Sequence, residues 1–194
     1  METPQEAELL KKYNQLYLAI ILRYKDYIEE KENLNVAELP KLILPADQSV
    51  ITVSNRIKNA FSDYSFANDY IEAAKLAYEY VKNEISTVSL PIEFWLTPTD
   101  MVKSGAGDIF DQATLLCSML IALGNVTAKV ITVIKPNERR FIVYSEFLGK
   151  IVAFDMDKGF GGFDSLEKLL EGLSLSGEDV TAYEFNDKMY NDLV

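Results

Sequence analysis

The sequence predicts an α+β fold, with a helical N-terminal half packed on an antiparallel sheet of about three to five strands. Apolar residues recur at helical spacing along much of the chain as far as Gly124. Short runs rich in Val, Ile and Phe follow, as is typical of strands. The chain has 194 residues, 48% of them apolar, which suffices for one domain with its own core and a helical extension.

The N-terminal segment is predicted to be one long amphipathic helix. The sequence TPQE at 3–6 provides a capping residue, a proline suited to the first turn and a glutamate for a capping box. Apolar residues, many of them tyrosines, then continue at helical spacing to about Lys31. We expect this face to pack on its own domain, with an intermolecular interface as the alternative. Residues 33–50 contain two prolines and look like a connector, so we divide the chain into residues 1–50 and a domain of residues 51–194.

Further helices are predicted before Gly124, a residue typical of helix C-terminal ends. TPTD at 97–100 repeats the capping pattern of the N-terminus. The predicted helices are residues 50–60, residues 66–85, a short one that ends before Gly105, and residues 109–123.

Strand signals dominate the rest of the chain. LGK at 148–150 predicts a tight hairpin between two of the strands. The glycine-rich GFGG at 159–162 is predicted to be a loop, and the C-terminal end is expected to be helical or frayed. The predicted strands are residues 128–134, 140–147, 150–155 and 181–185, with a short helix at 165–173.

The charge and composition exclude several classes of protein. A net charge of −11 opposes binding to nucleic acid and to anionic membranes, which both need Lys and Arg. The chain contains no histidine, which excludes Cys–His and Ser–His catalysis and a Cys/His zinc site. Cys117 is the single cysteine, so no intrachain disulfide can form. The opening METPQEAE shows no signal-peptide pattern, and we expect a cytoplasmic protein.

Two stretches of the chain resemble the core of transglutaminase-like domains, which share the papain-like cysteine protease fold. The first is FWLTPTDMVKSGAGDIFDQATLLCSMLIALGNVTAKV at 94–130. It matches the family pattern of a Thr/Pro-started turn, Gly-Asp-Cys, Asp-x-Ala, a leucine run and then LG before a strand. The second is RFIVYSEFLGKIVAFD at 140–155, similar to the two strands that carry the family's histidine and aspartate. The resemblance implies an α+β papain-like core.

The resemblance places the family's three catalytic positions on this chain. Gly107 and Asp108 match the motif, but the cysteine position is Ile109. The histidine position falls at Arg140, or at Phe141 if the alignment slips by one residue, and the aspartate matches Asp155. The family's nucleophile is a thiolate at a helix N-terminus, assisted by the histidine. The resemblance thus implies a degenerate site in which only the orienting acid is kept.

These substitutions lead us to expect a chain that is not an enzyme and that binds another protein. The groove of the resembled fold would be lined by Trp95, Gly107, Asp108 and Phe141. We expect no cofactor and no metal. A structural subunit that forms a homo-oligomer through residues 4–31 is one alternative.

A second alternative is a hydrolase that uses Asp108, Asp111 and Asp155 as an acid–base or metal-binding set. Structural roles for these residues are the competing interpretation, with Asp108 as a helix N-cap and Asp111 as a first-turn charge. If Arg140 faces Asp155, an ion pair would replace the family's His–Asp contact. We expect Cys117, among leucines and methionines in mid-helix, to be a buried apolar residue.

Overall fold

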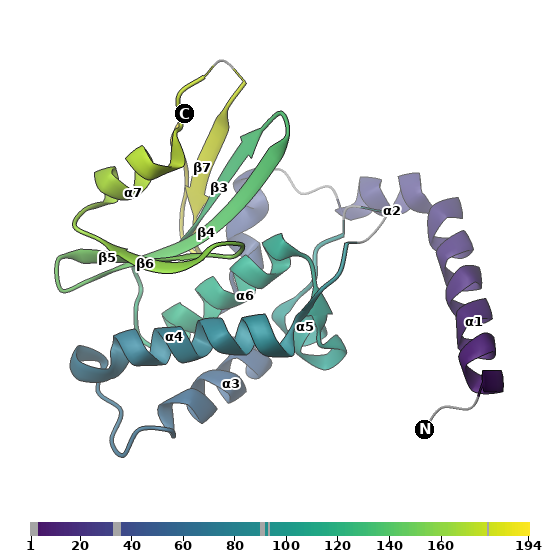
Figure 1. The fold of residues 1–194 in the computed structure, drawn as a ribbon, viewed down its shortest axis with the longest axis horizontal. Helices are drawn as coiled ribbons and strands as arrows, with labels where there is room; N and C mark the ends of the chain where they lie inside the picture. Colours follow the sequence, from purple (N-terminus) through teal and green to yellow (C-terminus); the bar gives the residue numbers. More distant parts are fainter. Residues whose placement is uncertain (1–3, 33–35, 90–91, 93, 178) are drawn as a thin grey trace. The chain divides into compact units, whose positions relative to one another are not determined.

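The structure is a computed structural model that describes residues 4–32, 36–89, 92, 94–177 and 179–194 (Figure 1). The chain divides into two compact units. The first comprises Met1–Asn33 and Ser89–Trp95, and the second comprises Leu34–Val88 and Leu96–Val194. Among the described helices, none combines the length and apolar character needed to cross a membrane.

The first unit contains α1 (Pro4–Arg23) and α2 (Lys25–Glu32). The predicted single helix is therefore divided at Tyr24. The backbone N–H of Tyr24 is shared between the carbonyls of Ile20 and Ile21, at 3.2 and 3.1 Å, which marks a local tightening of the helix. The predicted cap at Thr3 lies outside the described residues.

Capping residues begin several helices of the second unit. Asp47 caps α3 (Gln48–Lys58) by accepting from two backbone N–H groups. Thr97 caps α5 (Pro98–Ser104), and Gly105 ends that helix with φ +63°. The connector predicted at 33–50 contains a 3-10 helix, η1 (Val36–Leu42). The remaining helices are α4 (Phe66–Glu84), α6 (Ile109–Ala122) and α7 (Leu166–Leu173).

The described strands form a six-stranded antiparallel sheet and a separate two-stranded parallel ladder. The larger sheet has the order β6-β5-β4-β3-β7-β8. Its strands are β3 (Lys129–Lys135), β4 (Glu138–Phe147), β5 (Lys150–Asp155), β6 (Gly159–Phe163), β7 (Thr181–Phe185) and β8 (Tyr190–Asp192). The ladder joins β1 (Ser86–Thr87) to β2 (Ala106–Gly107). The α+β class is confirmed, and the sheet is larger than predicted.

Both additional strands, β6 and β8, lie at the sheet edges. The segment GFGG was predicted to be a loop because glycine has low strand propensity. In the structure it pairs with β5 from Ile151↔Phe163 to Asp155↔Gly159. The strand β6 is held by backbone hydrogen bonds to β5. Such bonds do not depend on side chains, whereas the prediction was based on side-chain preferences.

Helices cover both faces of the sheet (Figure 1). Helix α6 lies against one face, as shown by the contact of Phe110 with Phe141 of β4. On that face the Tyr70 hydroxyl of α4 also lies 2.6 Å from the Ser145 hydroxyl. Helix α7 covers the opposite face through a cluster that includes Leu169, Ile142 and Tyr144. Alternate residues of β4 therefore face different helices.

Candidate functional site

The candidate site is built around the N-terminus of α6. Strand β2 delivers the chain to Asp108, which caps the helix by accepting from the Asp111 N–H at 2.7 Å. The Asp108 N–H in turn donates to Asp111 Oδ2 at 3.1 Å, which completes a capping box. A Cβ on Gly107 would lie 3.2 Å from Asp111 Cβ, so this close approach favours a glycine. The predicted N-cap role of Asp108 is confirmed.

Asp111 is a buried carboxyl at this helix end, only 3% exposed. Its Oδ1 accepts from the Leu96 N–H at 3.2 Å. Burial, and then the neighbouring charge of Asp108, raise the pKa of Asp111 to about 7, against the lowering effect of its backbone hydrogen bonds. Two carboxyls therefore share the helix N-terminus, and the inner one can carry a proton near neutral pH.

Ile109 is the first residue of α6 and is half-buried. The next residue, Phe110, belongs to a group of aromatic rings. Phe110 contacts Phe141 of β4 with ring centroids 5.4 Å apart, and Phe185 of β7 at 6.0 Å. Tyr183 extends the group beside Phe185 at 6.3 Å. The helix end thus carries an apolar and aromatic surface, of which Phe141 and Tyr183 are half-buried.

Arg140 and Asp155 lie on the other face of the sheet. Asp155 is directly opposite Ile142, and Arg140 is two residues from Ile142 along β4. Because side chains alternate across a strand, all three point to one face, and Ile142 belongs to the cluster beneath α7. Phe141 points to the opposite face, toward Phe110. The structure therefore brings Phe141 to the α6 N-terminus, and it does not bring Arg140 and Asp155 there.

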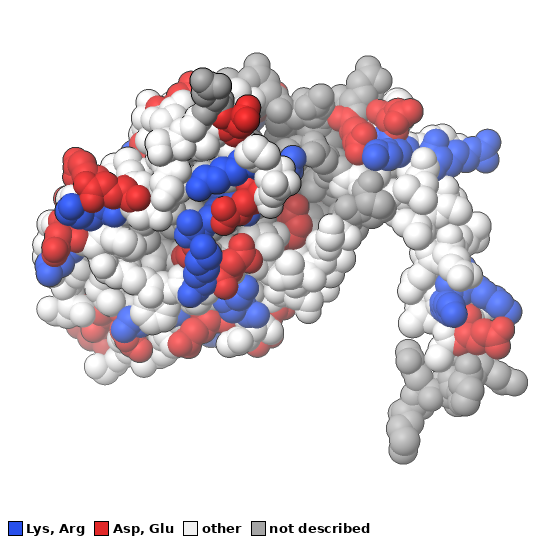
Figure 2. Space-filling model, turned by 45° about the horizontal axis from the view of Figure 1, so that its top comes forward, with Lys and Arg blue, Asp and Glu red and all other residues white. Residues whose placement is uncertain are grey.

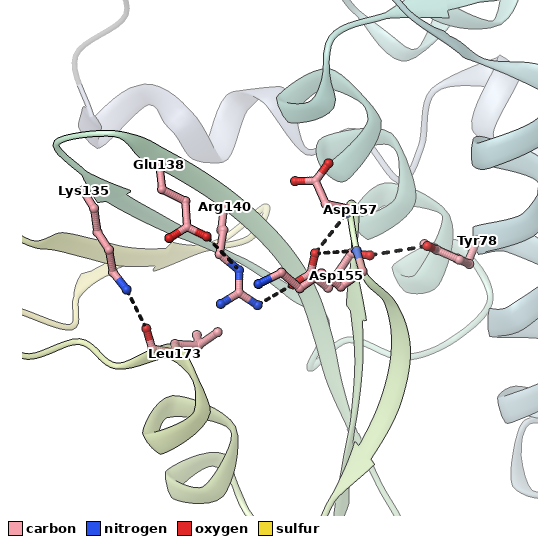
Figure 3. Close-up of polar contacts among 8 residues, drawn as sticks. Tyr78, Lys135, Glu138, Arg140, Asp155, Asp157 and Leu173 are labelled. Carbon is pink, nitrogen blue, oxygen red and sulfur yellow. Dashed lines mark hydrogen bonds and ion pairs between the residues drawn. The ribbon is translucent and has the colours of Figure 1, made fainter.

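Arg140 and Asp155 form the ion pair considered from the sequence (Figure 3). Arg140 Nη2 lies 2.5 Å from Asp155 Oδ2, and Asp155 Oδ1 accepts from the backbone N–H groups of Asp157 and Lys158. Burial opposes ionisation of Asp155, but the hydrogen bond from Arg140 and those two N–H groups outweigh it and lower the pKa of Asp155. The pair fastens the start of β4 to the β5–β6 turn.

Two further sequence-predicted residues are placed elsewhere. Cys117 is fully buried in mid-helix, and burial raises the pKa of its thiol, so the expectation of a buried apolar role is confirmed. Trp95 is half-buried and belongs to the first unit. Within the described part of the chain, no three or more Asp, Glu or Cys side chains gather into a group that could hold a metal ion.

The surface charge of one face is mixed. Figure 2 shows Lys and Arg side chains next to Asp and Glu side chains, without a broad patch of one sign. Phosphate-binding surfaces need clustered Lys and Arg. This face therefore offers no support for nucleic-acid binding.

Phe110 and Tyr183, which lie at this helix end, were not predicted from the sequence. The sequence did show that residues 140 and 141 lie on opposite faces of β4. Side chains alternate between the two faces of a strand, and the count can be made back from the LGK hairpin. Which face meets α6 was not readable from the sequence. Both faces of β4 carry buried apolar residues.

Comparison with solved structures identifies the fold. LapG from Legionella pneumophila superposes with a TM-score of 0.50 at 13% identity, over 82% of this chain and 88% of LapG. Its calcium-bound form gives a TM-score of 0.46 at 14% identity, over 74% and 87%. A candidate protease from Parabacteroides distasonis gives 0.43 at 16% identity, over 75% of this chain and 28% of that chain. No protein-family model and no curated protein sequence matches this chain.

LapG has the transglutaminase-like, papain-like fold, so the fold predicted from the sequence is confirmed. The prediction that the chain is not an enzyme is contradicted. The finding against it is that LapG, a cysteine protease, shares this fold. At 13% identity the likeness to LapG shows the fold alone. It assigns no role to any side chain of this protein.

Proposed function

We propose that this chain binds an extended polypeptide segment against the surface formed by Ile109, Phe141 and Tyr183 at the N-terminus of α6. The observation that carries the proposal is the half-buried apolar and aromatic surface at this helix end. Ile109 and Phe141 are half-buried, so each leaves apolar area open to a ligand. In LapG, a protease of the same fold, the ligand is a polypeptide, and this supports the same class of ligand here.

Ring contacts within the chain hold the aromatic side chains of this surface in place. The Phe110 ring packs against the Phe141 ring, and the Phe185 ring packs against the Tyr183 ring. Rings held in this way lose little conformational freedom when a ligand side chain packs on them.

Binding can be measured with reduced, carboxymethylated α-lactalbumin, a polypeptide that stays unfolded, by fluorescence anisotropy of a labelled sample. Ile109→Asp should weaken binding about tenfold, because a charge at this surface loses its hydration when the ligand packs on it. An acidic residue in the first turn of a helix is favourable, so the fold should persist. The control is Val126→Asp, at a side chain that is 62% exposed and lies beyond α6. Equal affinity of both variants and the wild type would refute the proposal.

The carboxyl pair at the same helix end supports a second candidate function, hydrolysis of the bound polypeptide. Asp108 is half-buried and in reach of solvent, and Asp111 lies behind it with a pKa of about 7. In such a pair the Asp108 carboxylate would take a proton from the water that attacks the peptide carbonyl. The protonated Asp108 would then give that proton to the leaving amine as the C–N bond breaks. Asp155, on the other face of the sheet, is not included.

Mass spectrometry of the same unfolded polypeptide tests this hydrolysis. The wild type should release fragments, and Asp108→Asn should abolish them while binding is retained, because Asn is an equally good N-cap. Cys117→Ala should leave cleavage unchanged, since the thiol is buried. Absence of fragments from the wild type between about pH 5 and pH 8 would refute hydrolysis and leave the binding proposal standing.

Three expectations from the sequence remain proposals. They are a protein partner, a cytoplasmic location and a homo-oligomer through residues 4–31. Size-exclusion chromatography of a chain with Tyr17→Glu would test the last, since a charge in the apolar face of α1 would separate the copies.

A further inference from the structure

The strand β6 lies at one edge of the six-stranded sheet. In the described sheet, β6 pairs with β5 on one side and is the last strand on the other. A strand at a sheet edge presents unpaired backbone N–H and C=O groups that can pair with another chain. The sequence of β6, GFGGF, contains no proline and no charge to block such pairing.

Gly159 has φ +103°, a conformation that favours glycine, whereas neither backbone conformation nor packing within the chain requires the glycine at position 161. A Cβ on Gly159 would meet no atom within 4 Å, and one on Gly161 would meet only a ring atom of Phe163 at 3.9 Å. The space beside these glycines is therefore open. Phe160, between them, is 50% exposed. A partner strand could place side chains over the glycines and cover this ring.

We propose that two copies of this chain pair antiparallel through β6, with Gly161 opposite Gly161 of the second copy. In this register Phe160 lies opposite Gly162 and Phe163 opposite Gly159 of the second copy, so each ring covers a glycine. Lys158 lies opposite Asp164 of the second copy, and the two-fold axis repeats that contact. The strand and its flanks, KGFGGFD, thus match themselves in both charge and shape when reversed.

Neighbouring registers lose this match. Along β6, every second residue points its backbone N–H and C=O toward the free edge. Two antiparallel copies can pair only where these residues face one another, so the register can change only in steps that preserve this match. One step places Phe160 opposite Phe160 of the second copy and Lys158 opposite Gly162. The other places Phe160 opposite Asp164. The charge contact selects the proposed register, and both charged side chains are available because Lys158 and Asp164 are exposed.

Asp164 already has a partner within the chain, and that partner does not prevent the contact. Lys150 Nζ lies 3.7 Å from Asp164 Oδ1, with side chains 72% and 90% exposed. An exposed pair of this kind contributes little. The carboxylate therefore stays accessible to a lysine of a second copy.

Charge exchange tests the register by sedimentation equilibrium of the full chain at low salt. Lys158→Asp and Asp164→Lys should each weaken the dimer about tenfold or more, because two opposite-charge contacts become two like-charge contacts. The double variant restores both contacts and should return to within about threefold of the wild type. Lys188→Asp, in the β7–β8 turn at the other edge of the sheet, is the charge-matched control and should have no effect.

Crosslinking tests the two-fold point. Gly161→Cys should form a disulfide-linked dimer on mild oxidation, because directly opposite residues in antiparallel strands have Cα atoms about 4.5–5.5 Å apart, within disulfide range. Cys117 is buried and does not compete. Gly172→Cys, at a glycine of α7 that also has open space, is the control. Any one of three results would overturn the proposal. The wild type could stay monomeric to about 100 μM, or neither charge reversal could weaken the dimer. The third is crosslinking of Gly161→Cys no greater than that of the Gly172→Cys control.

Discussion

The carboxyl pair at the start of α6 predicts an unusual dependence of stability on pH. Asp111 has a pKa of about 7 in the folded chain against a usual value of 3.8. The folded state therefore holds a proton that the unfolded state releases between these values. Stability from this group is present in full below about pH 4 and is lost as the pH rises through 7. Most carboxyls in proteins act in the opposite direction.

The magnitude follows from the difference between the two pKa values. A full shift from 3.8 to about 7 corresponds to about 4 kcal/mol at 1.36 kcal/mol per unit. Between pH 5 and pH 8 the wild type should lose about 2.5 kcal/mol of this contribution. Asp111→Asn cannot ionise, so the variant should not show this loss. The variant keeps a side-chain oxygen for the Leu96 N–H, although it loses one acceptor overall.

Urea unfolding followed by circular dichroism at a series of pH values gives the free energy of unfolding for each protein. The quantity to compare is the change in that free energy between pH 5 and pH 8. Asp100→Asn, at an exposed carboxyl of α5, is the matched control and should follow the wild type. If the Asp111→Asn curve runs parallel to the wild-type curve, Asp111 does not hold a proton at neutral pH and the interpretation of the pair fails.

Three further predictions concern the rest of the second unit. Asp155→Asn should lower the free energy of unfolding at pH 7 by about 2 kcal/mol, because Arg140 would keep its charge in a mostly buried place without its partner. The wild type should lose the same contribution as the pH falls toward the lowered pKa of Asp155. Gly124→Ala should cost about 1–2 kcal/mol in chemical unfolding, because φ is +113° and the new Cβ would lie 3.1 Å from the Phe66 ring. Cys117 should react with a thiol reagent only after unfolding, and rapid reaction in the native state would contradict its burial.

The helices of the domain could be predicted because their signals are local. Thr97 and Asp108 are capping residues in the sequence, and each caps a helix in the structure. The strands β3, β4 and β5 carry β-branched and aromatic residues and were also predicted. The strand β6 was not, because a glycine-rich edge strand depends on its neighbour for pairing and has little preference of its own. The break in the N-terminal helix at Tyr24 was missed because the apolar spacing continues through it.

The candidate site shows where sequence and tertiary structure divide. The sequence by itself determined which chemistry is absent, since a chain without histidine and with its one cysteine in mid-helix cannot form a Cys–His pair. It also placed Ile109 at the start of a helix. Only the tertiary structure decided that Phe141 faces this helix and that Arg140 pairs with Asp155 on the other side of the sheet. The reason is physical: a strand with two buried faces has no polar face in its sequence, so the elements that pack against it determine which side belongs to the site.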